Sequence, residues 1–154
     1  MKKALAYIVP ITFCFLLGYV AGRLQAYSVE HWYPLLEKPS LTPPNWVFPV
    51  AWGILYLFSG ISAGLAYTRA GIARSGLITL WTIQQFFNFT WSITFFMFEN
   101  PVLGFINIVI LDALVIIYAI RVWRVSHAAS VLFWPYICWI LFASYLNLYI
   151  MLHN

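Results

Sequence analysis

The side chains best suited to ligand binding lie on one face of an apolar segment between residues 76 and 98. Trp81, Gln84, Asn88, Trp91 and Phe95 follow one another at spacings of three, four, three and four. In a helix this spacing places them on one stripe. Because unpaired amides are costly in hydrocarbon, we expect the stripe to face the protein interior. There the amides bond either to neighbouring helices or to a ligand.

Other reactive side chains give no support for a metal site or an attached haem. Cys14 and Cys138 both fall inside apolar segments, where cysteine usually serves as a small packing residue. The chain has no CxxC motif and no Cys/His cluster. His31, His127 and His153 lie at predicted helix ends, where we expect surface residues. We therefore expect no metal and no cofactor.

The composition is that of an integral membrane protein. Of 154 residues, 64% are hydrophobic and only 8% are charged, which no soluble domain needs for its core. The length suits five or six spans of about 20 residues, without a soluble domain. The net charge is +4, but the basic residues are scattered and form no patch, which excludes nucleic acid as a partner.

The hydropathy pattern predicts an all-α bundle of five transmembrane helices, with residues 1–154 forming a single domain. The first apolar run imitates a secretory signal, but it is too long for one. Glycine pairs four residues apart in the first two spans permit close helix packing, and Pro135 favours a bend in the fifth. The approximate spans are Ala4–Ala21, Pro44–Tyr67, Gly76–Phe98, Pro101–Val122 and Ala128–Met151.

The segment from Trp32 to Asn45 is predicted to form a stiff lid between the first two helices. Pro39, Pro43 and Pro44 prevent a helix from continuing through it and reduce the entropy lost on ordering. The alternative is an ordinary connector with an aromatic anchor at the membrane interface. Lys38 could pair with a ligand carboxylate, although Glu37 and water are the favoured partners.

One carboxylate, Asp112, lies inside a predicted span. Such a group is costly near the bilayer centre, so we expect Asp112 to face the bundle, either protonated or paired. It is a functional candidate, and a structural hydrogen bond explains it equally well.

The charges at the helix ends predict the orientation. The end that holds the N-terminus is basic, and the other end carries three of the four acidic residues. The positive-inside rule then places the N-terminus in the cytoplasm of a bacterial inner membrane, with a mitochondrial outer membrane as the alternative. The basic end contains Lys2, Lys3, Arg69, Arg74, Arg121 and Arg124, and the other end Arg23, Glu30, Glu37, Lys38 and Glu99.

Three motifs, together with the stripe from Gln84 to Phe96, carry a resemblance to a known family. They are WYPLLEKPSLTPPNWVF at residues 32–48, VAWGILY at residues 50–56 and PYICWILFASYLN at residues 135–147. The chain resembles the tryptophan-rich sensory protein (TspO)/translocator protein family, also called peripheral benzodiazepine receptors. The likeness covers nearly the whole chain from residue 32 onward.

The resemblance implies a five-helix bundle whose cavity binds porphyrins such as protoporphyrin IX, and drugs of the benzodiazepine kind. It also implies a homodimer in contact with membrane lipid. The stripe residue Gln84 is a further candidate from its spacing. By motif position the ligand-binding residues are Trp32, Tyr33, Trp52, Asn88, Trp91, Trp139, Phe142 and Ala143.

Two departures limit what the resemblance implies. The pattern proposed for cholesterol recognition needs a basic residue after a tyrosine, and none follows Tyr149. Where the family has an acid in its fourth helix, this chain has Asn107, and Asp112 comes five residues later.

Three functions remain open. The favoured one is a membrane receptor or sensor that binds porphyrins or related apolar ligands. A second is an enzyme that degrades porphyrin in light and oxygen, as the resemblance implies, with Trp52 and Trp139 carrying the photochemistry. A tetrapyrrole or lipid transporter is the third, although the chain shows no inverted repeat or broken helix pair.

Overall fold

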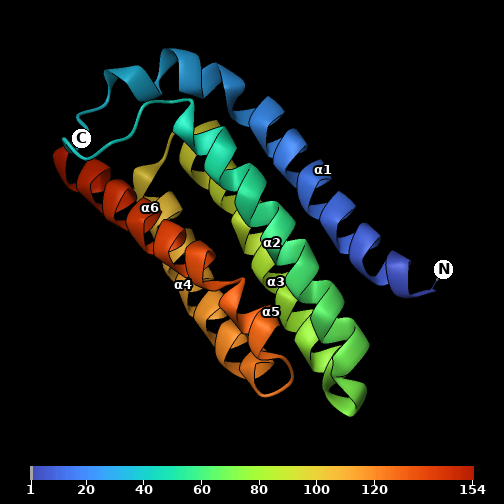
Figure 1. Ribbon diagram of the computed structural model, residues 1–154. Coiled ribbons are helices and arrows are strands. Elements are labelled where there is room, and N and C mark those ends of the chain that lie inside the picture. Colours follow the sequence, from blue (N-terminus) through green and yellow to red (C-terminus); the bar gives the residue numbers. More distant parts are fainter. Residues whose placement is uncertain (1) are drawn as a thin grey trace.

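The computed structural model describes residues 2–154, and in this range every regular element is helical (Figure 1). The helix η3 continues α3 without a break, and α5 and α6 together form the last membrane-length stretch. The prediction of a five-helix bundle is therefore confirmed. The elements are α1 (Lys2–His31), η1 (Tyr33–Leu35), α2 (Val47–Arg69), η2 (Gly71–Ala73), α3 (Arg74–Ser92), η3 (Ile93–Met97), α4 (Pro101–Trp123), α5 (His127–Val131) and α6 (Trp134–His153).

Four stretches within residues 2–154 are long and apolar enough to cross a membrane. They are Lys3–His31, Val47–Arg69, Pro101–Trp123 and His127–His153. The α3 helix is not among them, because its interior carries the amides of Gln84, Gln85 and Asn88. These three side chains are at most 5% exposed, so the polar face of α3 is turned into the protein. The protein is thus an integral membrane protein with helical spans.

The helix boundaries differ from the predicted ones mainly around the lid. α1 runs ten residues further than the predicted span, to His31. α2 begins at Val47 rather than at Pro44, because residues 44–46 form a turn in which the Val47 N–H donates to the Pro44 carbonyl (2.9 Å). The lid therefore comprises residues 32–46. It crosses the end of the bundle opposite the N-terminus, close to the end of α6 (Figure 1).

Proline and asparagine mark the two turns that the sequence predicts near α4 and α6. The Asn100 side chain accepts a hydrogen bond from the Leu103 N–H (3.0 Å), and Pro101 opens α4, as expected for a helix start. The predicted bend at Pro135 is a break: α5 ends at Val131 and α6 begins at Trp134. Since proline has no N–H, an unbroken helix could not be fully bonded there.

Small residues let α1 approach α2 closely. A Cβ atom on Gly60 would lie 2.6 Å from the Cα of Ile11, so only glycine permits this contact. The predicted glycines of α1 behave differently, because Gly18 lies against the Tyr56 ring and Gly22 faces open space. The two helices therefore pack glycine against larger residues, Gly60 of α2 on Ile11 and Gly18 of α1 on Tyr56, and not glycine against glycine.

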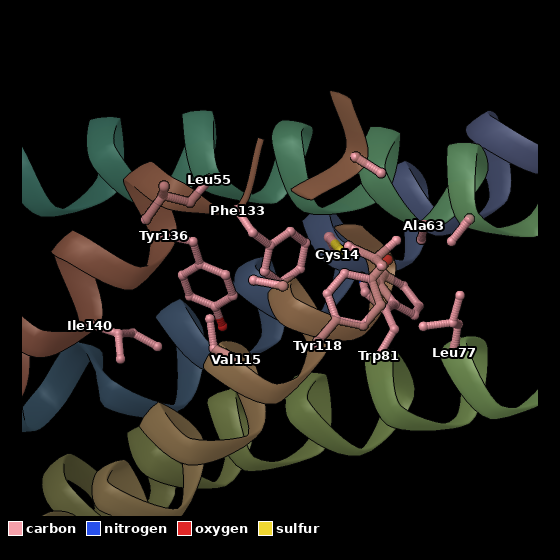
Figure 2. Close-up of a cluster of buried hydrophobic side chains, with 14 of the residues drawn as sticks. Cys14, Leu55, Ala63, Leu77, Trp81, Val115, Tyr118, Phe133, Tyr136 and Ile140 are labelled. Carbon is pink, nitrogen blue, oxygen red and sulfur yellow. The ribbon is translucent and has the colours of Figure 1, made fainter. Parts of the chain in front are cut away.

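The end of the bundle nearest the N-terminus has a solid core (Figure 2). The rings of Tyr118 and Phe133 are fully buried there, with centroids 4.5 Å apart. Ser62 lies within hydrogen-bond distance of the Tyr118 hydroxyl (3.2 Å) and donates to the Ala129 carbonyl (2.8 Å). This end is held by aliphatic and aromatic packing. Ser62 and Tyr118 are paired within it, whereas Gln85 Oε1 is buried without a hydrogen-bond partner among the described residues.

Candidate ligand-binding site

A cavity of about 520 Å³ lies beneath the lid, between α1, α2, the α3–η3 helix and α6. This volume falls in the range of small-molecule sites, about 300 to 1,000 Å³. Of the nine residues predicted to bind a ligand, the structure brings five to its wall: Tyr33, Trp52, Asn88, Trp91 and Ala143. The other four, Trp32, Gln84, Trp139 and Phe142, lie near it but do not line it.

The floor of the cavity is a chain of hydrogen bonds that joins three helices. Asn88 on α3 donates from Nδ2 to the hydroxyl of Tyr136 on α6 (2.9 Å), and that hydroxyl donates to Gln84 Oε1 (3.1 Å). The hydroxyl of Tyr56 on α2 donates to Asn88 Oδ1 at the long distance of 3.4 Å. Asn88 thus lines the cavity and bonds helix to helix, whereas Gln84, which is fully buried, only supports the floor.

Trp91 presents its ring to the cavity because its polar atom is used elsewhere. Its indole N–H donates to Asn147 Oδ1 (3.1 Å), and the Asn147 amide donates to the Pro101 carbonyl (2.8 Å). Trp91 also stacks on Phe95, with ring centroids 5.5 Å apart. The ring is thereby fixed, and the apolar surface that it offers is preorganised.

A wider turn brings two neighbouring phenylalanines into the site. In η3 the Phe98 N–H donates to the Ile93 carbonyl, five residues back (2.9 Å). Such π-type turns are rare and occur often at functional sites. Both Phe95 and Phe96 line the cavity, with ring centroids 4.8 Å apart. The sequence stripe predicts an inward Phe95 but gives no sign of the turn itself.

The two tryptophans proposed for photochemistry occupy different positions. Trp52 lines the cavity and stacks on Tyr56, with ring centroids 5.5 Å apart. Trp139 lies behind Phe48, which lines the cavity, with ring centroids 5.8 Å apart. Phe142 packs against Trp139 on the same helix (5.9 Å). The Trp139 indole nitrogen is buried and has no hydrogen-bond partner among the described residues.

The lid covers the cavity with aromatic rings. Tyr33 is only 7% exposed and packs on Phe96, with ring centroids 5.6 Å apart. Trp32 lies edge-on to Phe95 (5.5 Å), so it braces the wall from behind. Burial raises the pKa of Tyr33, which keeps its phenol neutral.

Lys38 stabilises the lid from within by bonding to the lid's own backbone. Its ammonium donates to the carbonyls of Tyr33 (2.7 Å), Leu36 (2.9 Å) and Pro34 (3.3 Å). It also lies 4.9 Å from the centre of the Tyr33 ring, a cation–π contact. Partial burial lowers the pKa of Lys38. The predicted pairing with Glu37 is not found among the described residues, because the Glu37 carboxylate accepts from the Tyr149 hydroxyl instead (3.4 Å).

The lid is also tied to the end of α6. The Asn154 side chain accepts from the Glu37 backbone N–H (2.9 Å) and donates to the Glu37 carbonyl (3.2 Å). The Tyr149 hydroxyl donates weakly to the Glu37 carboxylate (3.4 Å). A pair of bonds to one backbone residue fixes the lid relative to the helix bundle. No pattern in the sequence indicates this contact, which joins residues 117 positions apart.

The wall formed by α1 was also missed in the sequence. Phe15, Tyr19, Gly22 and Gln25 all line the cavity, although α1 carries no polar stripe like that of α3. The spacing of these residues could have indicated the wall, because Phe15 and Tyr19 lie one helical turn apart, as do Gly18 and Gly22. Gly22 leaves room there, because a Cβ atom on it would meet nothing within 4 Å.

The charge content of the site restricts its chemistry. Of the described residues that line the cavity, none is acidic, basic or histidine. Asp112 lies apart on α4 and faces the bundle as expected: its Oδ2 accepts a hydrogen bond from Ser144 on α6 (2.7 Å), and its Oδ1 is buried without a partner among the described residues. No group of three His, Cys, Asp or Glu side chains that could hold a metal occurs within residues 2–154. The arrangement is suited to enclosing an apolar molecule.

Comparison with known proteins identifies the family to which the chain belongs. The sequence profile of the TspO/MBR family matches residues 10–152. The chain is 41% identical to the tryptophan-rich protein TspO of Archaeoglobus fulgidus over 138 residues, 90% of each chain. It is 32% identical to the tryptophan-rich protein TspO of Chlorobaculum tepidum over 157 residues, 99% of this chain and 98% of the relative.

A vertebrate relative covers most of the same region. The translocator protein of Sus scrofa is 28% identical over 133 residues, 84% of this chain and 79% of its own length. The family profile itself matches residues 10–152, and this range includes part or all of every helix that surrounds the cavity. The chain belongs to the TspO/MBR family.

Proposed function

We propose that the protein is a membrane receptor or sensor that binds a porphyrin, such as protoporphyrin IX, or a related flat apolar molecule in the cavity beneath the lid. The observation that carries this proposal is the cavity wall. Aromatic rings from the lid, α2 and the α3–η3 helix surround an uncharged space, and amides of Asn88 and Asn147 lie at its edge. Such a site suits a ligand that offers a large π-face.

The uncharged wall also predicts how the ligand would be oriented. Carboxylates of a porphyrin would be costly to bury without a charged partner. They would therefore lie toward the open side of the cavity, where the polar side chains of Gln25 and Asn45 stand. The apolar face of the macrocycle would lie against Trp52 and Trp91.

A binding titration tests the proposal. Protoporphyrin IX added to purified protein in detergent should quench tryptophan fluorescence saturably, with a matching change in porphyrin absorbance. Trp52→Ala and Asn88→Leu should weaken binding by about tenfold, the equivalent of one lost contact worth about 1.4 kcal/mol. Trp134→Ala is the control, because Trp134 is 59% exposed and does not line the cavity. Quenching without saturation would refute the proposal.

The degrading enzyme is a second candidate that the position of Trp52 favours, since this indole lies on the cavity wall. Illumination of the bound porphyrin in oxygen should then bleach it, and Trp52→Phe should slow bleaching more than Trp139→Phe. Equal bleaching by wild type and both variants would remove the indoles from the chemistry. Protoporphyrin uptake into liposomes that contain only this protein would instead support a transporter.

We further infer that the protein resides in a bacterial inner membrane as a homodimer, with its N-terminus in the cytoplasm. The basic residues at the N-terminal end support this orientation. Labelling of single introduced cysteines in intact cells tests it: a cysteine in the lid should react with an impermeant reagent, and one at Arg74 should not. Cross-linking in the membrane tests the dimer.

A further inference from the structure

A second hollow lies outside the bundle, at the end of the molecule opposite the lid. It is a groove of about 620 Å³ between α1, α2 and α3. Val9, Pro10 and Phe13 form its α1 wall, and Ile78, Trp81 and Thr82 its α3 wall. The Thr82 hydroxyl donates to its own helix, to the Ile78 carbonyl (2.9 Å), so it offers the groove little polarity. The groove is apolar and open to the side of the bundle.

The length of the groove matches one leaflet of a bilayer. Its α1 wall runs from Leu5 to Phe13, nine residues that rise about 12 Å along the helix. On α3 the wall runs from Ile78 to Thr82, and Arg74 lies one helical turn before it. Half of the hydrocarbon core is about 15 Å thick. An acyl chain lying along the helices would therefore fit the groove from the interface toward the midplane.

Basic residues stand at the interfacial end of this groove. The Arg74 guanidinium lies 4.6 Å from the centre of the Tyr67 ring, and Tyr67 lines the groove. Arg74 precedes Ile78 by four residues and Trp81 by seven, so it shares their face of α3. Lys3 precedes Ala6 and Pro10 on α1 at the same helical spacing. Three of the four acidic residues, Glu30, Glu37 and Glu99, lie at the other end of the molecule.

We propose that this groove is a binding site for an anionic glycerophospholipid of the leaflet at the N-terminal end, with an acyl chain between α1 and α3 and the phosphate at Arg74. The apolar wall supplies affinity for the chain. Arg74, held in place by the Tyr67 ring, supplies selectivity for a negative headgroup, as basic pockets between membrane helices do. This site is separate from the cavity beneath the lid, with which it shares no lining residue.

Native mass spectrometry tests the proposal with two probes that have identical chains, phosphatidylglycerol and phosphatidylcholine. Delipidated full-length protein should retain one phosphatidylglycerol with a preference of about fivefold over phosphatidylcholine, the effect expected of one basic residue at the interface. Arg74→Gln should abolish the preference. Arg124→Gln is the matched control, because Arg124 lies at the same end but beyond α4, away from the groove.

A second pair of variants tests whether the shape of the groove contributes to lipid binding in addition to the charge of Arg74. Ala6→Phe fills the groove and should reduce retention of both lipids, whereas Ala4→Phe adds the same ring to an exposed position that does not line it. Unchanged porphyrin binding in all four variants would show that they fold. The proposal is overturned if the two lipids are retained equally, if Arg124→Gln acts like Arg74→Gln, or if protoporphyrin displaces the retained lipid. Cross-linking of two chains through Val9→Cys would assign the groove to a second copy and would also overturn it.

Discussion

The two ends of the bundle contain the same aromatic residue types and use them in opposite ways. At the N-terminal end Tyr118 and Phe133 are fully buried and fill the space between helices (Figure 2). At the lid end Trp52, Tyr56 and Trp91 are only partly buried and surround a cavity. Aromatic content alone therefore does not distinguish a core from a binding site.

Tyr136 lies at the boundary between the two ends. Its ring packs on Phe133 in the solid core, with centroids 5.5 Å apart. Its hydroxyl receives a hydrogen bond from Asn88 in the cavity wall. The difference between the ends is thus one of polar bracing. At the lid end, hydrogen bonds of Asn88 join side chains on three helices around the cavity. At the solid end, the bonds of Ser62 lie within a core that side chains already fill.

Removal of a ring should give the largest contrast between the two ends. Phe133→Ala leaves a void in a fully packed region and should cost about 3–5 kcal/mol. Trp52→Ala enlarges an existing cavity, so its cost should be clearly smaller. Thermal and denaturant unfolding in the same detergent measure both values. Equal losses would mean that the space beside Trp52 is filled and that the comparison fails.

Addition of a ring should lower stability at the solid end and ligand binding at the lid end. Ala129 is fully buried at the solid end, and Ala129→Phe should destabilise the protein by about 1–3 kcal/mol or more through overpacking. Ala143→Phe points into the cavity and should leave the unfolding free energy nearly unchanged while it weakens porphyrin binding by more than about tenfold. Tight porphyrin binding by Ala143→Phe would contradict the position of the site.

Removal of one tyrosine hydroxyl at each end compares the contribution of single hydrogen bonds to the unfolding free energy. Tyr136→Phe leaves the Asn88 amide and Gln84 Oε1 without this partner in a dry interior and should cost about 1–3 kcal/mol. Tyr118→Phe should cost only about 0.5–1.5 kcal/mol, because Ser62 keeps its bond to the Ala129 carbonyl. Unfolding free energies of both variants measure the difference. A larger loss for Tyr118→Phe than for Tyr136→Phe would mean that hydrogen bonds matter more at the solid end than beside the cavity.

The helices and the inward face of α3 could be predicted from the sequence because each has a local cause. Apolar runs of membrane length define the spans, and the spacing of Asn88 and Trp91 defines a face. The Asn100 cap and the break before Pro135 follow from the hydrogen-bonding limits of those residue types. The inward face of α3 could be predicted although α3 is not apolar enough to count as a membrane span by composition. The same amides that lower its hydropathy are the side chains that must turn inward.

The lining of the cavity could be predicted only in part because it depends on contacts between distant segments. Trp139 lies on the same face of α6 as Ala143, yet Phe48 stands between its ring and the cavity. The wall contributed by Phe15 and Tyr19 follows from how α1 leans on α2, which no local pattern describes. The bonds between Asn154 and Glu37 likewise exist only after the lid has crossed the bundle.

Loss of the bonds between Asn154 and Glu37 should have the smallest effect of the changes considered, because it alters the lid and leaves the cavity walls intact. Asn154→Ala removes two exposed hydrogen bonds to the Glu37 backbone, each worth about 0.5–1.5 kcal/mol at most, and touches neither the floor nor the solid core. We expect protoporphyrin to dissociate about two- to tenfold faster, and the unfolding free energy to fall by no more than these bonds supply, because only the lid is loosened. Stopped-flow displacement measures the rate, and Tyr149→Phe, which removes only the weak 3.4 Å contact, is the matched control. An unchanged dissociation rate in Asn154→Ala would show that the lid closes the cavity without help from α6. The prolines and Lys38 of the lid would then be enough to hold it in place, just as packing within the core is enough at the opposite end.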